Sequence, residues 1–372
     1  MDNDQEPRPG LLMGRVLGGV PIYVSRTWPV VAILIMFMFR PYADDIVTGP
    51  AVWIVSLTFA ILLYVSVLLH ELSHAAVARA FGLPVRAIIL HLLGGVTQIE
   101  RESPSPGKSF LVAAAGPAVS LLLGAAGALL VLTADLPPVP RLLVQVLTGS
   151  NLIVGVFNLL PGLPLDGGYL VRAIVWKITG SDRTGTVAAA QTGRGVAVLV
   201  LVAGTYAAGR DNGTDWFLVV WAAFLASFIW VGATQSLRAE RVRDRIPLLQ
   251  ARRLGRRAAL VTAETPLSVA LQRLQETQAG ALVVIDHEGR PTGLVSEQAV
   301  AAVPEARRPW TSTGDLARSL DADSTLAADL SGEDLVVAVR RTTATELLLL
   351  EPTGRIYGVL AVKDLAALLS RA

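Results

Sequence analysis

Two histidines and a glutamate within five residues give the strongest chemical signal in the chain. His70 and His74 are four residues apart, and Glu71 directly follows the first of them. On a helix, residues i and i+4 lie on one face, so both imidazoles can reach the same ion. Imidazoles at this spacing are typical zinc ligands, and the glutamate beside them can accept a proton from zinc-bound water. The pattern therefore predicts a catalytic zinc site.

The stretch before this motif, from Ala51 to Leu69, is almost wholly apolar. A chance occurrence of the pattern is the alternative interpretation, and in a long soluble protein it would be a serious one. Ionisable groups within a membrane span are costly, however, and their presence there favours a functional role. The setting therefore favours the zinc interpretation over chance.

A third ligand is needed, because two histidines do not complete a catalytic zinc site. The chain has no cysteine, so the ligand must be His, Asp or Glu. Asp166 follows a span expected to end at the same membrane face that His70 approaches, so the two depths agree. Pro161 and Pro164 break the helix before it and free backbone to face a cavity. An ordinary turn at Asp166-Gly167-Gly168 is the alternative, and the matching depth favours the ligand.

The composition is that of a membrane protein: 52% of residues are hydrophobic and only 17% are charged, against about 25% in soluble domains. We expect a polytopic α-helical membrane protein with about six spans. The distribution of Arg and Lys between the loops predicts that both termini are in the cytosol. The excess of Arg over Lys suggests a GC-rich bacterial genome, so we expect a bacterial inner membrane. The expected spans are residues 27–39 (extending back through 20–24), 51–81, 108–133, 141–160, 195–208 and 216–237.

Two further segments of the membrane part differ from the spans. Val85 to Ile99 is rich in β-branched residues around Gly94-Gly95, which predicts a membrane-associated β-hairpin. His91 within it is expected to be a packed residue and not a ligand. The arginine-rich run after the sixth span, within 238–257, is expected to contact anionic lipid at the inner face, and no nucleic acid is expected as a partner.

From about Ile246 the composition becomes that of a soluble α/β domain, and two units repeat about 65 residues apart. Each is expected to contain a β-turn-β pair followed by a helix. The first unit is expected to have strands at 281–285 and 291–295 and helices at 268–278 and 296–303. The second is expected to have strands at 335–339, 347–350 and 356–359 and helices at 325–329, 342–346 and 362–369.

Over residues 10–240 the chain resembles the site-2 protease family of intramembrane zinc metalloproteases. The resemblance rests on His70-Glu71-x-x-His74 and on Asn158 with Pro164-Leu165-Asp166-Gly167. It implies that His70, His74 and Asp166 bind one zinc ion, that Glu71 is the general base and that Asn158 lies near the oxyanion. It further implies cleavage of transmembrane segments of single-span substrates, such as an anti-sigma factor or another regulator. In one departure, the family's Gly-Pro-x-x-Asn ends in Ser120 here, which we expect to affect substrate contacts and leave the metal site unchanged.

The C-terminal repeats resemble a CBS domain pair, which implies adenine nucleotide binding or a homodimer through the pair. The nucleotide motif Gly-x-x-Ser/Thr-x-x-Asp is incomplete in both repeats. Gly293 and Ser296 are followed by Ala299, and Asp364 is preceded by Ala361. A nucleotide sensor and a structural or dimerising role therefore both remain open.

These observations divide the chain into a metalloprotease domain at 1–240, a basic linker at 241–257 and CBS repeats at 258–310 and 311–372. A transporter or channel gated by CBS domains would also explain spans followed by cytosolic repeats. It would not explain Glu71 between two histidines together with an aspartate at matching depth. A catalytically inactive relative that only binds helices is a third interpretation, and the intact set of ligands argues against it.

Overall fold

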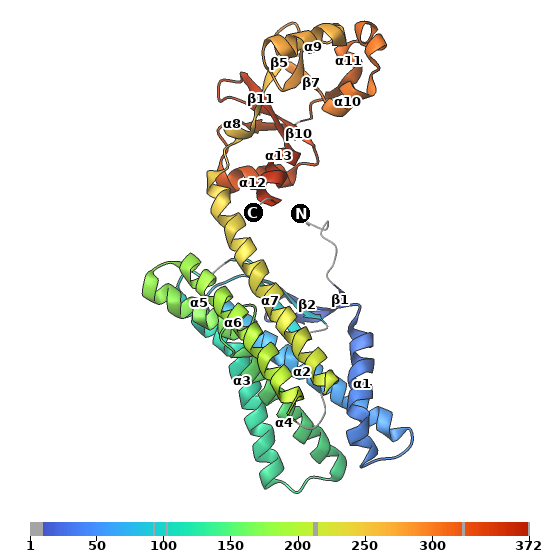
Figure 1. The fold of residues 1–372 in the computed structure, drawn as a ribbon, viewed down its shortest axis with the longest axis vertical. Helices are drawn as coiled ribbons and strands as arrows, with labels where there is room; N and C mark the ends of the chain where they lie inside the picture. Colours follow the sequence, from blue (N-terminus) through green and yellow to red (C-terminus); the bar gives the residue numbers. More distant parts are fainter. Residues whose placement is uncertain (1–9, 92–93, 102, 211–214, 322–323, 371–372) are drawn as a thin grey trace. The chain divides into compact units, whose positions relative to one another are not determined.

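The structure is a computed structural model that describes residues 10–91, 94–101, 103–210, 215–321 and 324–370. The chain divides into two compact units, residues 1–237 and 238–372, which are described separately. Figure 1 shows the helices of unit 1 and the mixed strands and helices of unit 2.

Unit 1 is mainly helical. Its helices are α1 (Trp28–Asp44), α2 (Ala51–Ala80), α3 (Pro106–Thr133), α4 (Pro138–Asn158), α5 (Asp166–Thr179), α6 (Asp182–Ala208) and α7 (Trp216–Arg245), the last of which continues past the unit boundary. Five helices of the described chain, namely α2, α3, α4, α6 and α7, are long and apolar enough to cross a membrane. The expected class of polytopic helical membrane protein is confirmed. The expected first span is α1, which has 17 residues and is not among the five.

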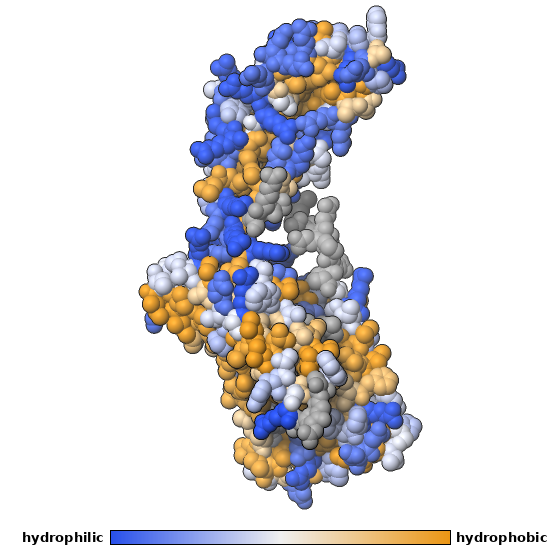
Figure 2. All heavy atoms as spheres, viewed as in Figure 1, coloured by the Kyte–Doolittle hydropathy of each residue, from blue (hydrophilic) through white to orange (hydrophobic). Residues whose placement is uncertain are grey.

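Apolar side chains cover much of the surface of unit 1, as membrane-facing helices require. Figure 2 shows hydrophobic residues gathered over its helices, whereas the visible face of unit 2 is largely hydrophilic. Large side chains such as Leu132, Ile178 and Tyr206 are more than three-quarters exposed. Exposure on this scale is costly in water and favourable in lipid, which agrees with the composition.

A four-stranded sheet lies against α2. Its strands are β1 (Leu11–Val16), β2 (Val20–Val24), β3 (Val85–His91) and β4 (Gly94–Ile99), in the spatial order β1-β2-β3-β4. The predicted hairpin is therefore present as β3 and β4, and β4 is an edge strand. His91 is half-buried on β3, where it pairs with Gly94.

The prediction that residues 20–24 extend the first span was wrong. Val20 and Ile22 alternate along β2 and are buried against Ala75 of α2 together with Ile88 of β3. This period-2 pattern is typical of a strand. A short apolar run next to a helix does not distinguish the two structures by hydropathy alone.

The expected fifth span, 195–208, begins earlier than predicted, because α6 starts at Asp182. Gly180 ends α5 with a positive φ of 73°, and the Ser181 side chain caps α6 by accepting from the Thr184 amide. Arg172 of α5 and Asp182 of α6 form an ion pair with an N–O distance of 2.7 Å. The charges therefore bind each other across two packed helices.

Unit 2 contains one seven-stranded sheet in the order β8-β7-β6-β5-β11-β10-β9. Its strands are β5 (Arg256–Thr262), β6 (Ala281–Ile285), β7 (Pro291–Val295), β8 (Ala317–Ser319), β9 (Thr325–Ala327), β10 (Glu346–Leu350) and β11 (Ile356–Ala361). Its helices are α8 (Ala251–Leu254), α9 (Leu267–Glu276), α10 (Glu297–Ala302), α11 (Thr313–Leu316), α12 (Gly332–Arg341) and α13 (Val362–Ser370), with 3₁₀ turns at Ile246–Leu248 and Glu305–Trp310.

The predicted repeat is visible in the strand pairing. In the first half, β5 pairs parallel to β6, and β6 pairs antiparallel to β7. In the second half, β9 pairs parallel to β10, and β10 pairs antiparallel to β11. The two halves join where β11 pairs antiparallel to β5. Both halves therefore have the same topology.

Three element predictions in the second repeat were wrong. The expected strand at 335–339 lies in α12, where Leu335, Val336 and Val339 are buried at helical spacing. The expected helix at 325–329 begins with β9, and most of the expected helix at 342–346 is the connection from α12 to β10. Adjacent valines favour a strand by local preference, and here packing of one helical face determines the structure.

Candidate metal centre

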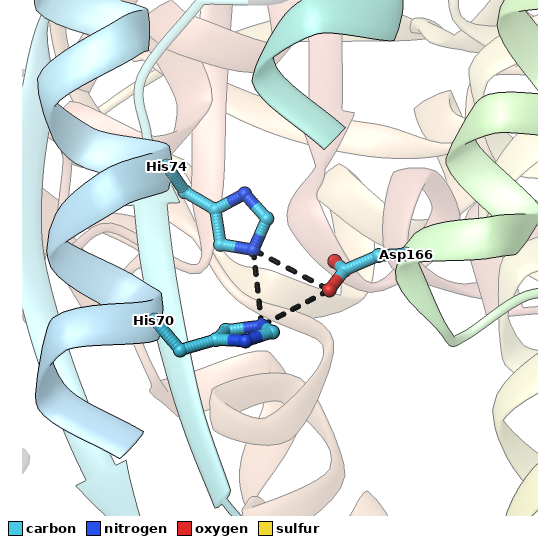
Figure 3. A group of neighbouring side chains, drawn as sticks. All are labelled: His70, His74 and Asp166. Atoms are coloured by element: carbon cyan, nitrogen blue, oxygen red, sulfur yellow. Dashed lines mark hydrogen bonds and ion pairs between the residues drawn. The ribbon is translucent and has the colours of Figure 1, made fainter. Parts of the chain in front are cut away.

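The side chains of His70, His74 and Asp166 converge on one point, as Figure 3 shows. The Asp166 Oδ2 atom is 3.1 Å from His70 Nε2 and 3.4 Å from His74 Nε2. The two Nε2 atoms are 3.3 Å apart. Both histidines are more than nine-tenths buried, and Asp166 is partly buried. The fold therefore brings together two histidines and an aspartate that lies 96 residues after His70 in the sequence.

Two segments position these three groups. His70 and His74 lie on one face of α2, as the spacing predicts. Asp166 is the first residue of α5, directly after the segment 159–165 that leaves α4. A Cβ at Gly167 would lie 2.3 Å from the Leu160 carbonyl oxygen, so only glycine allows α5 to begin against this segment. This close packing directs Asp166 back towards α2.

A third helix, α3, fixes the orientation of both rings. His74 Nδ1 lies 2.7 Å from the Val112 carbonyl oxygen, and His70 Nδ1 lies 2.9 Å from the Ser120 hydroxyl oxygen. The carbonyl can only accept, so His74 carries its proton on Nδ1 and leaves the Nε2 lone pair facing the space between the three ligand atoms. The sequence analysis linked Ser120 to substrate contacts, and the structure shows that it also contacts a predicted metal ligand, His70.

The space between the ligand atoms fits a metal ion. A Cβ added at Gly116 of α3 would lie 2.2 Å from His74 Nε2 and 2.5 Å from His70 Nε2. Zinc binds imidazole nitrogen at about 2.0–2.1 Å. Glycine therefore keeps a side chain away from both nitrogen atoms. The three ligand atoms are 3.1, 3.4 and 3.3 Å apart, which suits bonds of this length around one tetrahedral ion. Two imidazoles and one carboxylate are the donor set of a catalytic zinc site with an open position.

Glu71 is buried beside the histidines and is held by the hairpin. The Thr97 hydroxyl on β4 lies 2.8 Å from Glu71 Oε2 and 3.0 Å from the Glu71 carbonyl oxygen. A Cβ at Gly95 would lie 2.2 Å from Glu71 Cγ, so β4 approaches this side chain closely. The sequence indicated the hairpin through Gly94-Gly95 but gave no sign that Thr97 contacts Glu71.

Asn158 is the last residue of α4 and is half-buried. Within the described part of the chain, the hydrogen bonds of the His70, His74 and Asp166 side chains go to Ser120, Val112 and one another. None of them involves Asn158. Its place near an oxyanion therefore stays a prediction.

Comparisons with known proteins find zinc metalloproteases among the relatives of this chain. The profile of peptidase family M50 matches residues 58–141 and 139–202, and the CBS domain profile matches residues 254–304. Rip3 of Mycobacterium tuberculosis, which carries the provisional name of a zinc metalloprotease, is 35% identical over 331 residues, covering 84% of this chain and 81% of Rip3. A Synechocystis protein with the same provisional name is 29% identical over 92% of this chain and 91% of its own length.

A solved structure, the site-2 protease from Methanocaldococcus jannaschii, is 27% identical and covers 61% of this chain and 94% of that chain, with a TM-score of 0.44. The conclusion rests on the sequence relatives and on the family profile. The chain belongs to peptidase family M50, the site-2 protease family of zinc metalloproteases, and it carries a C-terminal CBS domain.

Proposed function

We propose that the chain is an intramembrane endopeptidase that cleaves transmembrane segments of single-span proteins. The observation that carries this proposal is the convergence of two buried imidazoles and a carboxylate on one point, with Glu71 beside them. All of these groups lie in a unit whose helices could cross a membrane. A transport site would not need a glutamate held against two paired histidines.

In this proposal His70, His74 and Asp166 hold one zinc ion. When bound, the ion supplies Lewis acidity, which polarises a peptide carbonyl and makes a water molecule acidic near neutral pH. Glu71 accepts the proton of that water and returns it to the leaving amine. Thr97 keeps the carboxylate in place for both transfers, because its hydroxyl donates to Oε2. Asn158 is proposed to stabilise the negative oxygen that develops during attack.

The hairpin supplies a place for the substrate. Carbonyls of a transmembrane helix are bonded within the helix, so the substrate must become extended before it is cut. β4 is an edge strand, Val96 on it is exposed, and Gly95 and Thr97 contact Glu71. We infer that the substrate adds to β4 as a further strand beside the general base.

Cellular placement follows the charge distribution. We place the chain in a bacterial inner membrane with both termini in the cytosol, because basic residues gather on the side of the termini. An anti-sigma factor or a similar single-span regulator is the proposed type of substrate.

We propose that the CBS domain pair regulates the protease or joins two copies of the chain in a homodimer. In the structure Asp364, the acidic residue of the incomplete nucleotide motif, accepts from Arg256 Nη2 at 2.9 Å. Arg256 also pairs with Glu297, which in turn binds Lys363 at 2.7 Å. Because Asp364 already has this partner, the contacts argue against an adenine nucleotide at this helix start, and we propose a homodimerising or structural role instead.

The test is cleavage of a panel of single-span proteins by the purified chain in detergent or nanodiscs. Glu71→Gln removes the general base and keeps the shape of the side chain, so it should abolish cleavage and leave zinc content unchanged. Glu100→Gln, at an exposed carboxylate just after β4, is the matched control and should cleave as the wild type does. Cleavage that is indifferent to Glu71→Gln would contradict the proposal and favour a transporter or an inactive scaffold.

A further inference from the structure

One face of α3 packs against the two histidines of α2. Val112, Gly116 and Ser120 are each four residues apart, so they lie on one face of α3. Val112 contacts His74 through its carbonyl oxygen, Ser120 contacts His70, and Gly116 leaves space between the two rings. Residues four apart on α3 therefore pack against the two histidines that are four apart on α2.

The two histidines nevertheless differ in what holds them. The Val112 carbonyl can only accept, so it allows a single tautomer of His74. The Ser120 hydroxyl can accept from Nδ1 or donate to it, so it allows both tautomers of His70. Only the tautomer with the proton on Nδ1 leaves the Nε2 lone pair free for a metal. The tautomer of His70 therefore depends on the Ser120 side chain, which a substitution can remove.

The hydrogen bond between Ser120 and His70 is buried. Ser120 is 1% exposed and His70 is 5% exposed, so the contact at Nδ1 is shielded from bulk solvent. A buried imidazole N–H without an acceptor costs about 1–3 kcal/mol. The same cost makes the Nδ1-protonated tautomer of His70 unfavourable when Ser120 lacks its oxygen.

We propose that Ser120 is the positioning residue that makes His70 a zinc ligand, and that it sets the zinc affinity of the site. The inference rests on the proposed function, because it needs His70, His74 and Asp166 to hold the metal. Bound zinc requires the His70 Nε2 lone pair, so Ser120 then accepts from Nδ1–H. Loss of such an outer contact typically lowers metal affinity by about 10- to 100-fold.

The experiment measures the zinc dissociation constant of the full chain in detergent by competition with a chelator. Ser120→Ala should weaken zinc binding by about 10- to 100-fold. Ser120→Thr keeps the hydroxyl and should bind zinc more tightly than Ser120→Ala. Ser56→Ala is the matched control, because Ser56 is a fully buried serine on α2 whose hydroxyl donates to the Val52 carbonyl of its own helix.

A second readout separates positioning from a general loss of structure. At saturating zinc, Ser120→Ala should recover most of its cleavage rate with an unchanged KM, because only occupancy of the site is impaired. Equal zinc affinity in Ser120→Ala and Ser56→Ala would overturn the inference while leaving the proposed function intact. Failure of the wild type itself to bind zinc would instead contradict the proposed function.

Discussion

Adding one methyl group at Gly116 should disable the metal centre without touching any ligand. In Gly116→Ala the new Cβ would lie 2.2 Å from His74 Nε2 and 2.5 Å from His70 Nε2. Non-bonded heavy atoms prefer separations of about 3.5 Å, so both rings must move by about 1 Å. The methyl group also takes the space in which a zinc ion would contact these nitrogens.

The size of the effect follows from overpacking. Inserting a methylene into a packed site typically costs about 1–3 kcal/mol, and each 1.4 kcal/mol is a factor of about ten in affinity. Because the methyl group displaces two ligands at once, we expect zinc affinity to fall by about 100-fold or more. Cleavage should be lost with it, whereas folding of the helical bundle should persist.

The assay is zinc competition on the purified chain, with Gly107→Ala as the control on the same helix. Gly107 has no heavy atom within 4 Å of an added Cβ, so alanine should be harmless there. Zinc affinity in Gly116→Ala equal to that in Gly107→Ala would refute the claim that the metal lies between these two rings.

Three further predictions concern the hairpin and the C-terminal unit. Thr97→Val removes the hydrogen bond to the Glu71 carboxylate, so kcat should fall about 10- to 100-fold at unchanged zinc content, and an unaltered kcat would contradict the role of Thr97. Val96→Pro should block the addition of a substrate strand at β4 and abolish cleavage. Leu12→Pro, on the opposite edge strand β1, is the control and should have no such effect. Cleavage by Val96→Pro would refute this mode of substrate binding. Burial, with a contribution from Glu297, raises the pKa of Glu346, so its ionised form costs stability above the ordinary glutamate pKa. Glu346→Gln should therefore raise the thermal unfolding midpoint at pH 8, with a gain that disappears as pH falls below that ordinary value; a pH-independent gain would contradict it.

The sequence predicted the centre of the site because its chemistry restricts the residue types. Two histidines at i and i+4 on an apolar helix need an acidic or imidazole partner at the same depth, and Asp166 met that requirement. The hairpin was predictable because Gly94-Gly95 interrupts a β-branched run. The two repeats were predictable from their spacing of 65 residues, which recurs between the starts of β6 and β10.

The parts that escaped prediction depend on contacts between elements. Nothing local shows that the Val112 carbonyl and the Ser120 hydroxyl meet the two imidazoles, because these contacts arise only when α3 packs on α2. A spacing of four at Val112, Gly116 and Ser120 is the one available signal, and it becomes informative only with a known partner helix. The helix α12 was missed because packing of one helical face outweighed the local preference of its valines for a strand. The strand β2 was missed because a short apolar run beside a helix looks like part of a span by hydropathy alone.

The measurement that tests the central claim most directly is the zinc content of the purified chain. The account predicts about one zinc ion per chain in the wild type and in Glu71→Gln, and almost none in Asp166→Ala. Glu71→Gln retains zinc because it changes the base and no ligand. Zinc held equally well by Asp166→Ala, or absent from the wild type, would contradict the assignment of His70, His74 and Asp166 as one metal centre.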